Sequence, residues 1–149
     1  MADSVTVFVF LSETCPICKS YTLPLKTLYK TYKDKPLKFI GVFPNYYSTQ
    51  QEIAEFKKTY AIPFELIKDD GTLTKKFNAT VTPQAFVLNS KGEIVYSGRI
   101  DNSFYAIGKR RTTITSNDLD NAIKHLLAKD LVTTPSTEAV GCIITLKEP

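Results

Sequence analysis

Apolar residues recur along this chain in short runs, separated by stretches with helical periodicity. Residues 5–11 are almost continuously apolar and rich in β-branched and aromatic side chains, which is typical of a strand buried on both faces. Shorter apolar runs bounded by turn residues predict further strands at 37–43, 64–68, 84–88 and 93–97. The last two runs flank Asn-Ser-Lys-Gly at 89–92, so they are expected to form a hairpin.

Helices are expected between these strands. Apolar residues at helical spacing predict one helix over 16–33, which Pro24 should kink because proline lacks a backbone N–H. A capping box with Ser48 at the cap and Gln51 three residues later predicts a second helix. A short helix is expected at 72–77, and apolar residues at 119, 122, 123, 126 and 127 predict a last one. We interpret 99–115 as a long polar connection and expect a last short strand within 139–146.

The predicted order of elements, βαβαβαββα, contains no internal repeat. Alternating strands and helices indicate an α/β fold, in which a central mixed sheet carries helices on both faces and ends in an antiparallel hairpin. We expect one domain over 1–130, followed by a C-terminal tail over 131–149 that packs on or near it.

Composition narrows the class of protein. The 149 residues are 43% hydrophobic and 23% charged, which is enough apolar content to bury a core. The longest uninterrupted apolar run has five residues, so no membrane span is expected. The net charge of +4 is too small to indicate nucleic-acid binding. The chain begins without an export signal, which predicts a cytoplasmic protein as written; a signal removed beforehand would instead indicate a periplasmic or exported one.

Cys15 and Cys18 carry the candidate chemistry, since Cys-Pro-Ile-Cys follows a buried strand and opens a helix. The free N–H groups and positive dipole at a helix N-terminus favour the thiolate of Cys15, and Pro16 suits the first helical position. Pro16 and Ile17 set Cys18 one turn further on the same side, at a separation that suits a disulfide. The motif predicts that Cys15 attacks a substrate disulfide and that Cys18 resolves the mixed disulfide. The expected product is a Cys15–Cys18 bridge that leaves Cys142 free.

Other interpretations of the three cysteines stay open. In one of them the Cys15–Cys18 pair is structural, or binds a metal together with a partner. A closed four-ligand zinc site is hard to assemble within a chain whose single histidine is His125. Cys142 is either a second resolving or partner-linking thiol, reached when the tail folds back, or a small buried hydrophobic residue.

The motifs between residues 8 and 98 follow one another in a specific order. A strand is followed by Cys-Pro-Ile-Cys, a kinked helix, an extra β–α unit at 64–77 that includes Asp-Asp-Gly-Thr-Leu at 69–73, then Thr-Pro at 82–83 and the hairpin. This order resembles that of thioredoxin-like redoxins, the class that includes bacterial thiol–disulfide oxidoreductases and alkyl hydroperoxide reductase (AhpC/TSA)-like domains. Segments 108–111 and 137–142 of the chain are similar to a subgroup of these domains.

The resemblance implies further roles. Thr82 and Pro83 would form a cis-proline loop that faces the Cys-Pro-Ile-Cys motif, with the Thr82 backbone pairing with a substrate strand. Thr14, directly before the motif, would be a further substrate contact. The implied protein is a thiol–disulfide oxidoreductase that acts on protein disulfides or dithiols with a partner reductase, without an organic cofactor or a metal. We expect it to be a monomer.

Acidic groups depart from the pattern of thioredoxins. Val9 stands where thioredoxins carry a buried acid, six residues before the first cysteine. Glu13 is the nearest acid in the sequence and is expected to be solvated in its loop.

Two functions of other classes stay open. One is a thiol peroxidase that uses Cys15 with Cys18 or Cys142 as the resolving thiol, although Phe8 stands where the peroxiredoxin motif requires proline. The other is a non-catalytic thioredoxin-fold module that binds a partner or a metal ion.

Overall fold

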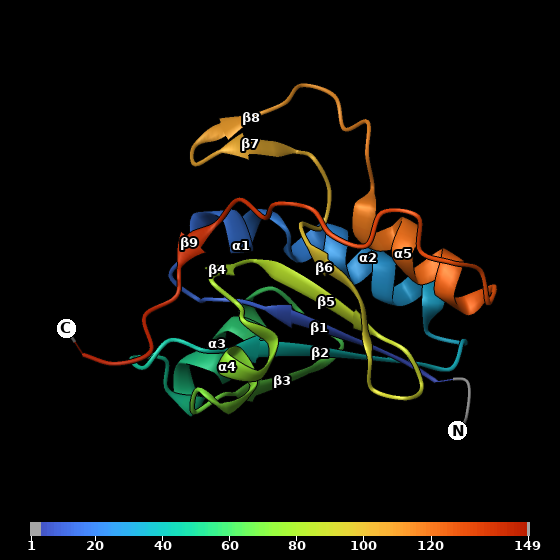
Figure 1. Ribbon diagram of the computed structural model, residues 1–149. Coiled ribbons are helices and arrows are strands. Elements are labelled where there is room, and N and C mark those ends of the chain that lie inside the picture. The colour runs from blue at the N-terminus through green and yellow to red at the C-terminus, as the bar shows by residue number, and fades with distance from the viewer. Residues whose placement is uncertain (1–3, 149) are drawn as a thin grey trace.

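The computed structural model describes residues 4–148, with helices arranged around a five-stranded sheet (Figure 1). The strands are β1 (Val5–Phe10), β2 (Leu37–Phe43), β3 (Glu65–Lys68), β4 (Val81–Thr82), β5 (Gln84–Leu88), β6 (Ile94–Gly98), β7 (Phe104–Ala106), β8 (Lys109–Arg110) and β9 (Cys142–Ile143). The helices are α1 (Pro16–Ser20), α2 (Thr22–Tyr32), α3 (Gln50–Thr59), α4 (Thr72–Phe77) and α5 (Asp118–Leu127). None of the helices in this described part combines the length and the hydrophobicity needed to cross a bilayer.

The main sheet is mixed and has the order β3-β2-β1-β5-β6. β1 pairs in parallel with β2 and β2 with β3, whereas β5 runs antiparallel to both β1 and β6. Parallel neighbours need a long return connection, which α1 and α2 supply between β1 and β2 and α3 supplies between β2 and β3. This topology confirms the predicted α/β fold with a mixed sheet that ends in an antiparallel hairpin.

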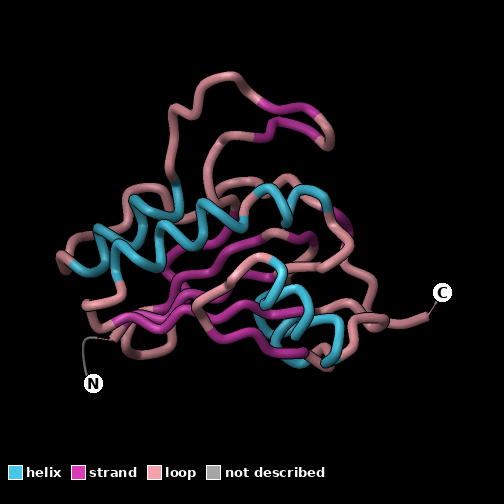
Figure 2. The backbone as a smooth tube through the Cα atoms, turned by 180° about the vertical axis from the view of Figure 1, so that it is seen from behind, coloured by secondary structure: helices cyan, strands magenta, loops and turns pink. Residues whose placement is uncertain are grey.

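Side chains of the central strand β1 alternate between two apolar layers. Val7 and Val9 are fully buried in a layer to which α1, α2, α3 and α5 also contribute. Phe10 lies in the other layer, where its ring centroid is 6.3 Å from that of Phe77 in α4 and 5.4 Å from that of Phe86 in β5. Helices therefore cover both faces, and α2 lies beside α5 in both views (Figures 1 and 2). β1 is thereby fixed between two layers, immediately before the cysteine motif.

The single helix expected over 16–33 is two helices, which meet at Tyr21. Pro24 lies in the first turn of α2, three residues after this junction. Proline offers no N–H to the carbonyl four residues earlier, that of Ser20, and its ring crowds that carbonyl. α1 therefore ends at Ser20, so Pro24 interrupts the helix as predicted, but the break lies before the proline.

The capping box of α3 begins one residue later than predicted. Thr49, not Ser48, is the cap: its hydroxyl accepts the Glu52 N–H at 3.1 Å, and the Glu52 carboxylate accepts the Thr49 N–H at 3.2 Å. Both frames satisfy the spacing rule, but glutamate is the stronger acceptor at the third helical position. Ser48 is thereby free to donate a hydrogen bond to Glu13 at 2.6 Å.

The stretch 99–115, predicted to be a polar connection, contains a second hairpin of β7 and β8. Gly108 takes a φ of +74° at its turn, a conformation that glycine adopts without strain. The Phe104 ring lies 5.2 Å from the Arg110 guanidinium carbon and 5.8 Å from the Tyr21 ring. Figure 1 shows the hairpin standing over α1. Its strands have three and two residues, too few to produce a recognisable alternation in the sequence.

Candidate active site

Cys15 lies at the junction between β1 and α1. It is the N-cap residue of α1, with extended backbone angles, and Pro16 occupies the first helical position as predicted. The Lys19 N–H donates to the Cys15 carbonyl at 3.1 Å, which closes the first turn. Cys15 is only 1% exposed, whereas Pro16 is exposed. The helix start therefore carries a cysteine that is covered by other parts of the chain.

Cys18 lies one turn further along α1 and is completely buried. The Ser12 N–H donates a hydrogen bond to its sulfur at 3.4 Å. Burial removes the stabilisation of the thiolate by water and raises the pKa of Cys18 to about 12, although the Ser12 hydrogen bond acts in the opposite direction. Cys18 is thus a protonated thiol at neutral pH, and Ile17 beside it is buried as well.

The sulfur of Cys15 is bonded to that of Cys142, 127 residues away in sequence. The two Cα atoms are 6.1 Å apart, within the range that disulfides span. Cys18 is the free cysteine of the three. The sequence predicted Cys18 as the bonding partner of Cys15, but in the structure the partner is Cys142. No local spacing rule reports a contact over such a separation, which depends on how the tail folds back.

The Thr82–Pro83 peptide bond is cis, as the resemblance to redoxins implies. The Thr82 carbonyl oxygen lies 3.4 Å from Cys15 Sγ, so the predicted loop does face the cysteine motif. The outer edge of this loop is occupied. β9 pairs with β4 in antiparallel orientation, with Thr82 opposite Cys142 and Val81 opposite Ile143. The strand expected within 139–146 is thus reduced to the two residues that contact the loop.

Residues 135–145, which we call the strap, hold β9 in place from both sides. Upstream, the Thr137 N–H donates to the Ser97 carbonyl at 3.0 Å, and the Arg99 N–H donates to the Thr137 hydroxyl at 2.9 Å. Downstream, the Thr145 N–H donates to the Asn45 side-chain oxygen at 2.7 Å. The tail therefore packs across the domain, and Cys142 lies between two anchored ends.

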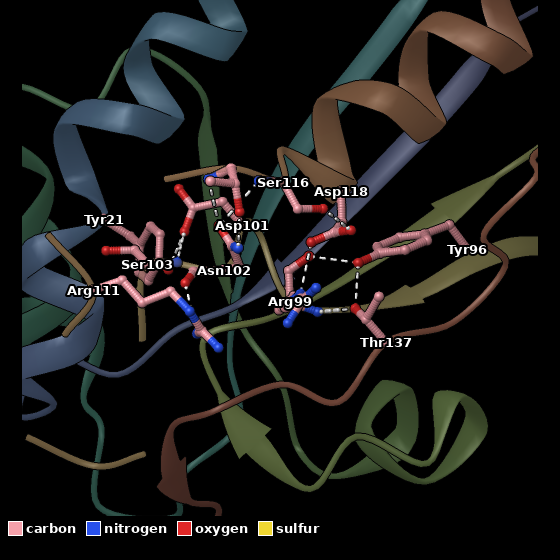
Figure 3. Close-up of polar contacts among 11 residues, drawn as sticks. Tyr21, Tyr96, Arg99, Asp101, Asn102, Ser103, Arg111, Ser116, Asp118 and Thr137 are labelled. Atoms are coloured by element: carbon pink, nitrogen blue, oxygen red, sulfur yellow. Dashed lines mark hydrogen bonds and ion pairs between the residues drawn. The ribbon is translucent and has the colours of Figure 1, made fainter. Parts of the chain in front are cut away.

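A polar network connects the upstream end of the strap to the rest of the domain (Figure 3). The Tyr96 hydroxyl lies 2.6 Å from the Thr137 hydroxyl and donates to the Arg99 carbonyl at 2.6 Å. The Arg99 side chain forms an ion pair of 2.6 Å with Asp118, at the start of α5. The strap, the main sheet and α5 are thus connected by a single network of hydrogen bonds and an ion pair.

Thr14 and Glu13 form the rim of the site. The Thr14 hydroxyl lies 2.9 Å from that of Ser12 and 3.0 Å from that of Tyr47, and Thr14 is exposed. Glu13 was expected to be solvated, but one of its oxygens accepts the Ser48 hydroxyl, and the other is buried without a partner among residues 4–148. The one-residue shift of the α3 cap explains this difference, because it frees Ser48 to reach Glu13.

Within residues 4–148, no group of three or more His, Cys, Asp or Glu side chains is placed to hold a metal ion. His125, the single histidine, lies in α5 and its Nδ1 is 2.8 Å from the Leu131 carbonyl oxygen.

A cysteine at the start of the helix that follows the central strand, facing a cis-proline loop, defines a thioredoxin-like redoxin. The model of the AhpC/TSA family matches residues 1–97, and the chain belongs to that family. Among curated proteins, the chain is 30% identical over 91 residues to sporulation thiol-disulfide oxidoreductase A of Bacillus subtilis, covering 60% of this chain and 55% of that protein. It is 25% identical over 100 residues to a putative chloroplastic peroxiredoxin Q of Oryza sativa, covering 62% and 45%. The chain thus spans about half the length of these curated relatives.

Solved structures share the fold. StoA from Bacillus subtilis superposes with a TM-score of 0.58 at 27% identity, covering 65% of this chain and 74% of that one. An uncharacterised conserved protein from Geobacillus kaustophilus superposes with a TM-score of 0.88 at 23% identity, covering 99% and 79%. A hypothetical protein from Sinorhizobium meliloti gives 0.86 at 23% identity, covering 99% and 82%. These last two matches extend over the strap, so the whole architecture, tail included, recurs in other proteins.

Proposed function

We propose that this chain is a thiol–disulfide oxidoreductase in which Cys15 is the nucleophile and Cys142 or Cys18 supplies the second sulfur. One observation carries the proposal: Cys15 is bonded to a cysteine on a strand that pairs with the Thr82–Pro83 loop. The similarity to a protein named as a thiol-disulfide oxidoreductase supports the same class of reaction.

The proposed cycle alternates between the Cys15–Cys142 disulfide and the two thiols. Passing from the disulfide to the dithiol takes two electrons and two protons from a partner dithiol, which becomes a disulfide. The reverse passage oxidises Cys15 and Cys142 while a protein disulfide is reduced. The substrates are accordingly protein disulfides or dithiols, and a partner reductase or oxidant completes the cycle.

The neighbouring residues have distinct roles in this proposal. Pro16 and Ile17 set Cys18 one helical turn after Cys15, Thr82 and Pro83 form the loop that faces the reacting sulfur, and Thr14 is a further substrate contact directly before it. Cys142 forms the bridge first because it already lies at Cys15, whereas Cys18 must lose a proton in a site that disfavours its thiolate. Cys18 then serves as a second resolving thiol, which the Cys-Pro-Ile-Cys spacing favours.

The test combines thiol mapping with an activity assay. The protein is equilibrated in buffers of graded dithiol/disulfide ratio, free thiols are alkylated, and tryptic peptides are identified by mass spectrometry. Cys15 and Cys18 fall in peptide 1–19 and Cys142 in peptide 130–147. We expect a reversible link between these two peptides, and catalysis of insulin reduction that Cys15→Ser abolishes. Full activity of Cys15→Ser, or no disulfide at any ratio, would reject the proposal.

The same preparation distinguishes the peroxidase alternative. Hydrogen peroxide is added to the reduced protein, and a dimedone-type probe traps sulfenic acid. Rapid consumption of peroxide with a trapped Cys15 sulfenic acid, without insulin reduction, would favour a thiol peroxidase, which the name of the rice relative also suggests.

A further inference from the structure

We propose that Gly141 and β9 form a built-in substrate strand, and that a partner dithiol attacks this protein at Cys142 rather than at Cys15. The inference rests on the thiol–disulfide exchange proposed above. It concerns which sulfur the partner contacts, and what kind of peptide can take the place of the strand.

The edge of the cis-proline loop is already occupied. Thr82 is paired with Cys142, and the Ile144 N–H donates to the Thr80 carbonyl at 3.1 Å just beyond β9. An extended peptide from another protein can pair with Thr82 only after these contacts are broken. Strand β9 thus occupies the position of a disulfide substrate: it pairs with the backbone of Thr82 and carries the sulfur that is bonded to Cys15.

Gly141 makes this close fit possible. A Cβ atom at residue 141 would lie 2.2 Å from the Thr82 carbonyl oxygen and 2.6 Å from its carbonyl carbon. These are backbone atoms, which cannot rotate away as a flexible side chain would. A peptide that replaces the strand in the same register therefore needs a glycine immediately before its cysteine. This defines the substrate class as extended segments that contain Gly-Cys.

The anchors of the strap do not depend on the disulfide. Thr137 upstream and Thr145 downstream are held by hydrogen bonds to Ser97, Arg99 and Asn45. Reduction breaks the S–S bond but leaves these contacts intact. Cys142 therefore stays beside Cys15 in the reduced protein, and the strand continues to cover Cys15.

Exposure decides which sulfur a partner reaches. Cys15 is 1% exposed and Cys18 is fully buried, whereas Cys142 is partly exposed and its neighbour Ile143 is 79% exposed. In thiol–disulfide exchange the attacked sulfur must be accessible along the line of the breaking bond. Of the two bonded sulfur atoms, that of Cys142 belongs to the more exposed residue.

The exchange with a partner dithiol proceeds in two steps. A thiolate of the partner dithiol attacks Cys142 Sγ, a partner–Cys142 disulfide forms, and the Cys15–Cys142 bond breaks with Cys15 leaving as a thiolate. The second partner thiolate then attacks the partner sulfur of the mixed disulfide, and Cys142 leaves and takes a proton from water. The partner is oxidised to a disulfide by two electrons, which reduce Cys15 and Cys142.

The first test locates the attack. The oxidised full-length protein is exposed briefly to the monothiol 2-mercaptoethanol, quenched by alkylation and digested with trypsin. We expect at least tenfold more mercaptoethanol adduct on peptide 130–147 than on peptide 1–19. An adduct on Cys15, or a Cys15–Cys18 bridge with Cys142 released, indicates attack at Cys15 and overturns the inference.

The second test loosens the strand without removing any sulfur. Gly141→Ala places a methyl group against the Thr82 backbone, so it is expected to raise the alkylation rate of Cys15 in the reduced protein about tenfold. Gly92→Ala is the control for an added methyl group, because its Cβ meets no atom within 4 Å and its φ of +80° confines the strain to the turn between β5 and β6. Equal rates in Gly141→Ala and the wild type contradict the inference. If the Cys15–Cys142 bond forms but these results fail, the proposed function stands and only the built-in strand is rejected.

Discussion

The backbone N–H of Ser12 donates a hydrogen bond to the sulfur of Cys18 over 3.4 Å. Ser12 lies two residues after the end of the central strand β1, so this contact ties the second cysteine of the motif to the segment that leaves that strand. The hydrogen bond favours the thiolate, but it does not offset the loss of water around a completely buried sulfur. Cys18 consequently differs from an ordinary exposed thiol, and this difference can be measured.

Cys18 should resist ionisation until strongly alkaline pH. In the oxidised protein Cys15 and Cys142 are bonded, so the only remaining thiol is that of Cys18. Because burial raises its pKa to about 12, we expect no thiolate absorbance near 240 nm up to about pH 10, after subtraction of the spectrum of Cys18→Ala. In urea the same thiol should titrate near its ordinary value. A native-state midpoint between pH 8 and 9 would contradict the burial argument.

The same shift predicts how stability depends on pH. The folded protein holds the Cys18 proton to about pH 12, whereas the unfolded chain releases it near the ordinary value of 9.0. The unfolded state therefore binds fewer protons between these values, so the contribution is complete below about pH 9 and is lost as pH rises toward 12. The free energy of unfolding should fall by about 1.4 kcal/mol per pH unit in this window. Urea titrations at pH 8, 9 and 10 should show this extra decrease in wild type relative to Cys18→Ala, and parallel curves would refute it.

The sequence allowed most of the sheet to be predicted, because its signals are local. The strands at 37–43 and 84–88 and the helix around Leu119 are marked by apolar runs or periodicity within single elements, and the structure contains them. The cap of α3 is shifted because Ser48 and Thr49 both fit the pattern, and Glu52, the stronger acceptor, selects Thr49 as the cap. The position of the cysteine motif could likewise be predicted from the sequence, but which of its cysteines is bonded could not.

The partner of Cys15 could not be predicted for a physical reason. Within one helix turn, spacing alone brings Cys18 near Cys15. Cys142, by contrast, is held near Cys15 by hydrogen bonds between residues 38 to 100 positions apart in the sequence. The signals that do exist are Gly141 and Gly98, at the two points where the strap approaches backbone or side-chain atoms too closely for a Cβ. A glycine beside a lone cysteine is thus a weak but usable sign of such a contact.

Replacing Glu13 should make Cys18 more acidic. The carboxylate of Glu13 acts on Cys18 as a nearby negative charge, which contributes to the raised pKa of that thiol. Glu13→Gln removes the charge and keeps the shape, so the Cys18 titration should move to lower pH. The measurement is the 240 nm titration of the oxidised protein. Glu55→Gln, which removes an exposed carboxylate of α3, serves as the control and should leave the midpoint in place. An upward shift in Glu13→Gln would be inconsistent with this electrostatic role.

Gly98 should tolerate no side chain. It has a φ of +146°, and a Cβ there would lie 2.2 Å from the Thr137 hydroxyl and 2.4 Å from the Thr137 carbonyl oxygen. Gly98→Ala is expected to lower the free energy of unfolding by about 3 kcal/mol, because strain and a clash with backbone act together. Gly108 also has a positive φ, but a Cβ there would meet no atom within 4 Å. Gly108→Ala should therefore lower the free energy of unfolding by only about 1 kcal/mol. Chemical denaturation compares the two variants, and equal losses would show that the strap exerts no steric constraint at Gly98.

Tyr21 should hold the second hairpin against α1 and α2. Its hydroxyl donates to the buried carboxylate of Asp101 at 2.6 Å, and the same oxygen accepts the Ser103 N–H at 2.8 Å (Figure 3). Tyr21→Phe keeps the ring that packs on Phe104 but leaves Asp101 with one donor fewer in a buried site. The expected cost is about 1–3 kcal/mol, since unpairing a buried charged group is expensive.

Hydrogen exchange separates a local effect of this substitution from a global one. If Tyr21 anchors the hairpin, amides of β7 and β8 in Tyr21→Phe should exchange faster at denaturant concentrations where the main sheet remains protected. Tyr29→Phe, in α2, is the matched control because its ring also packs on phenylalanines, with centroids 5.8 and 6.2 Å away. Uniform acceleration across the sheet would instead mean that Tyr21 stabilises the whole domain, and that the hairpin has no separate attachment to α1 and α2.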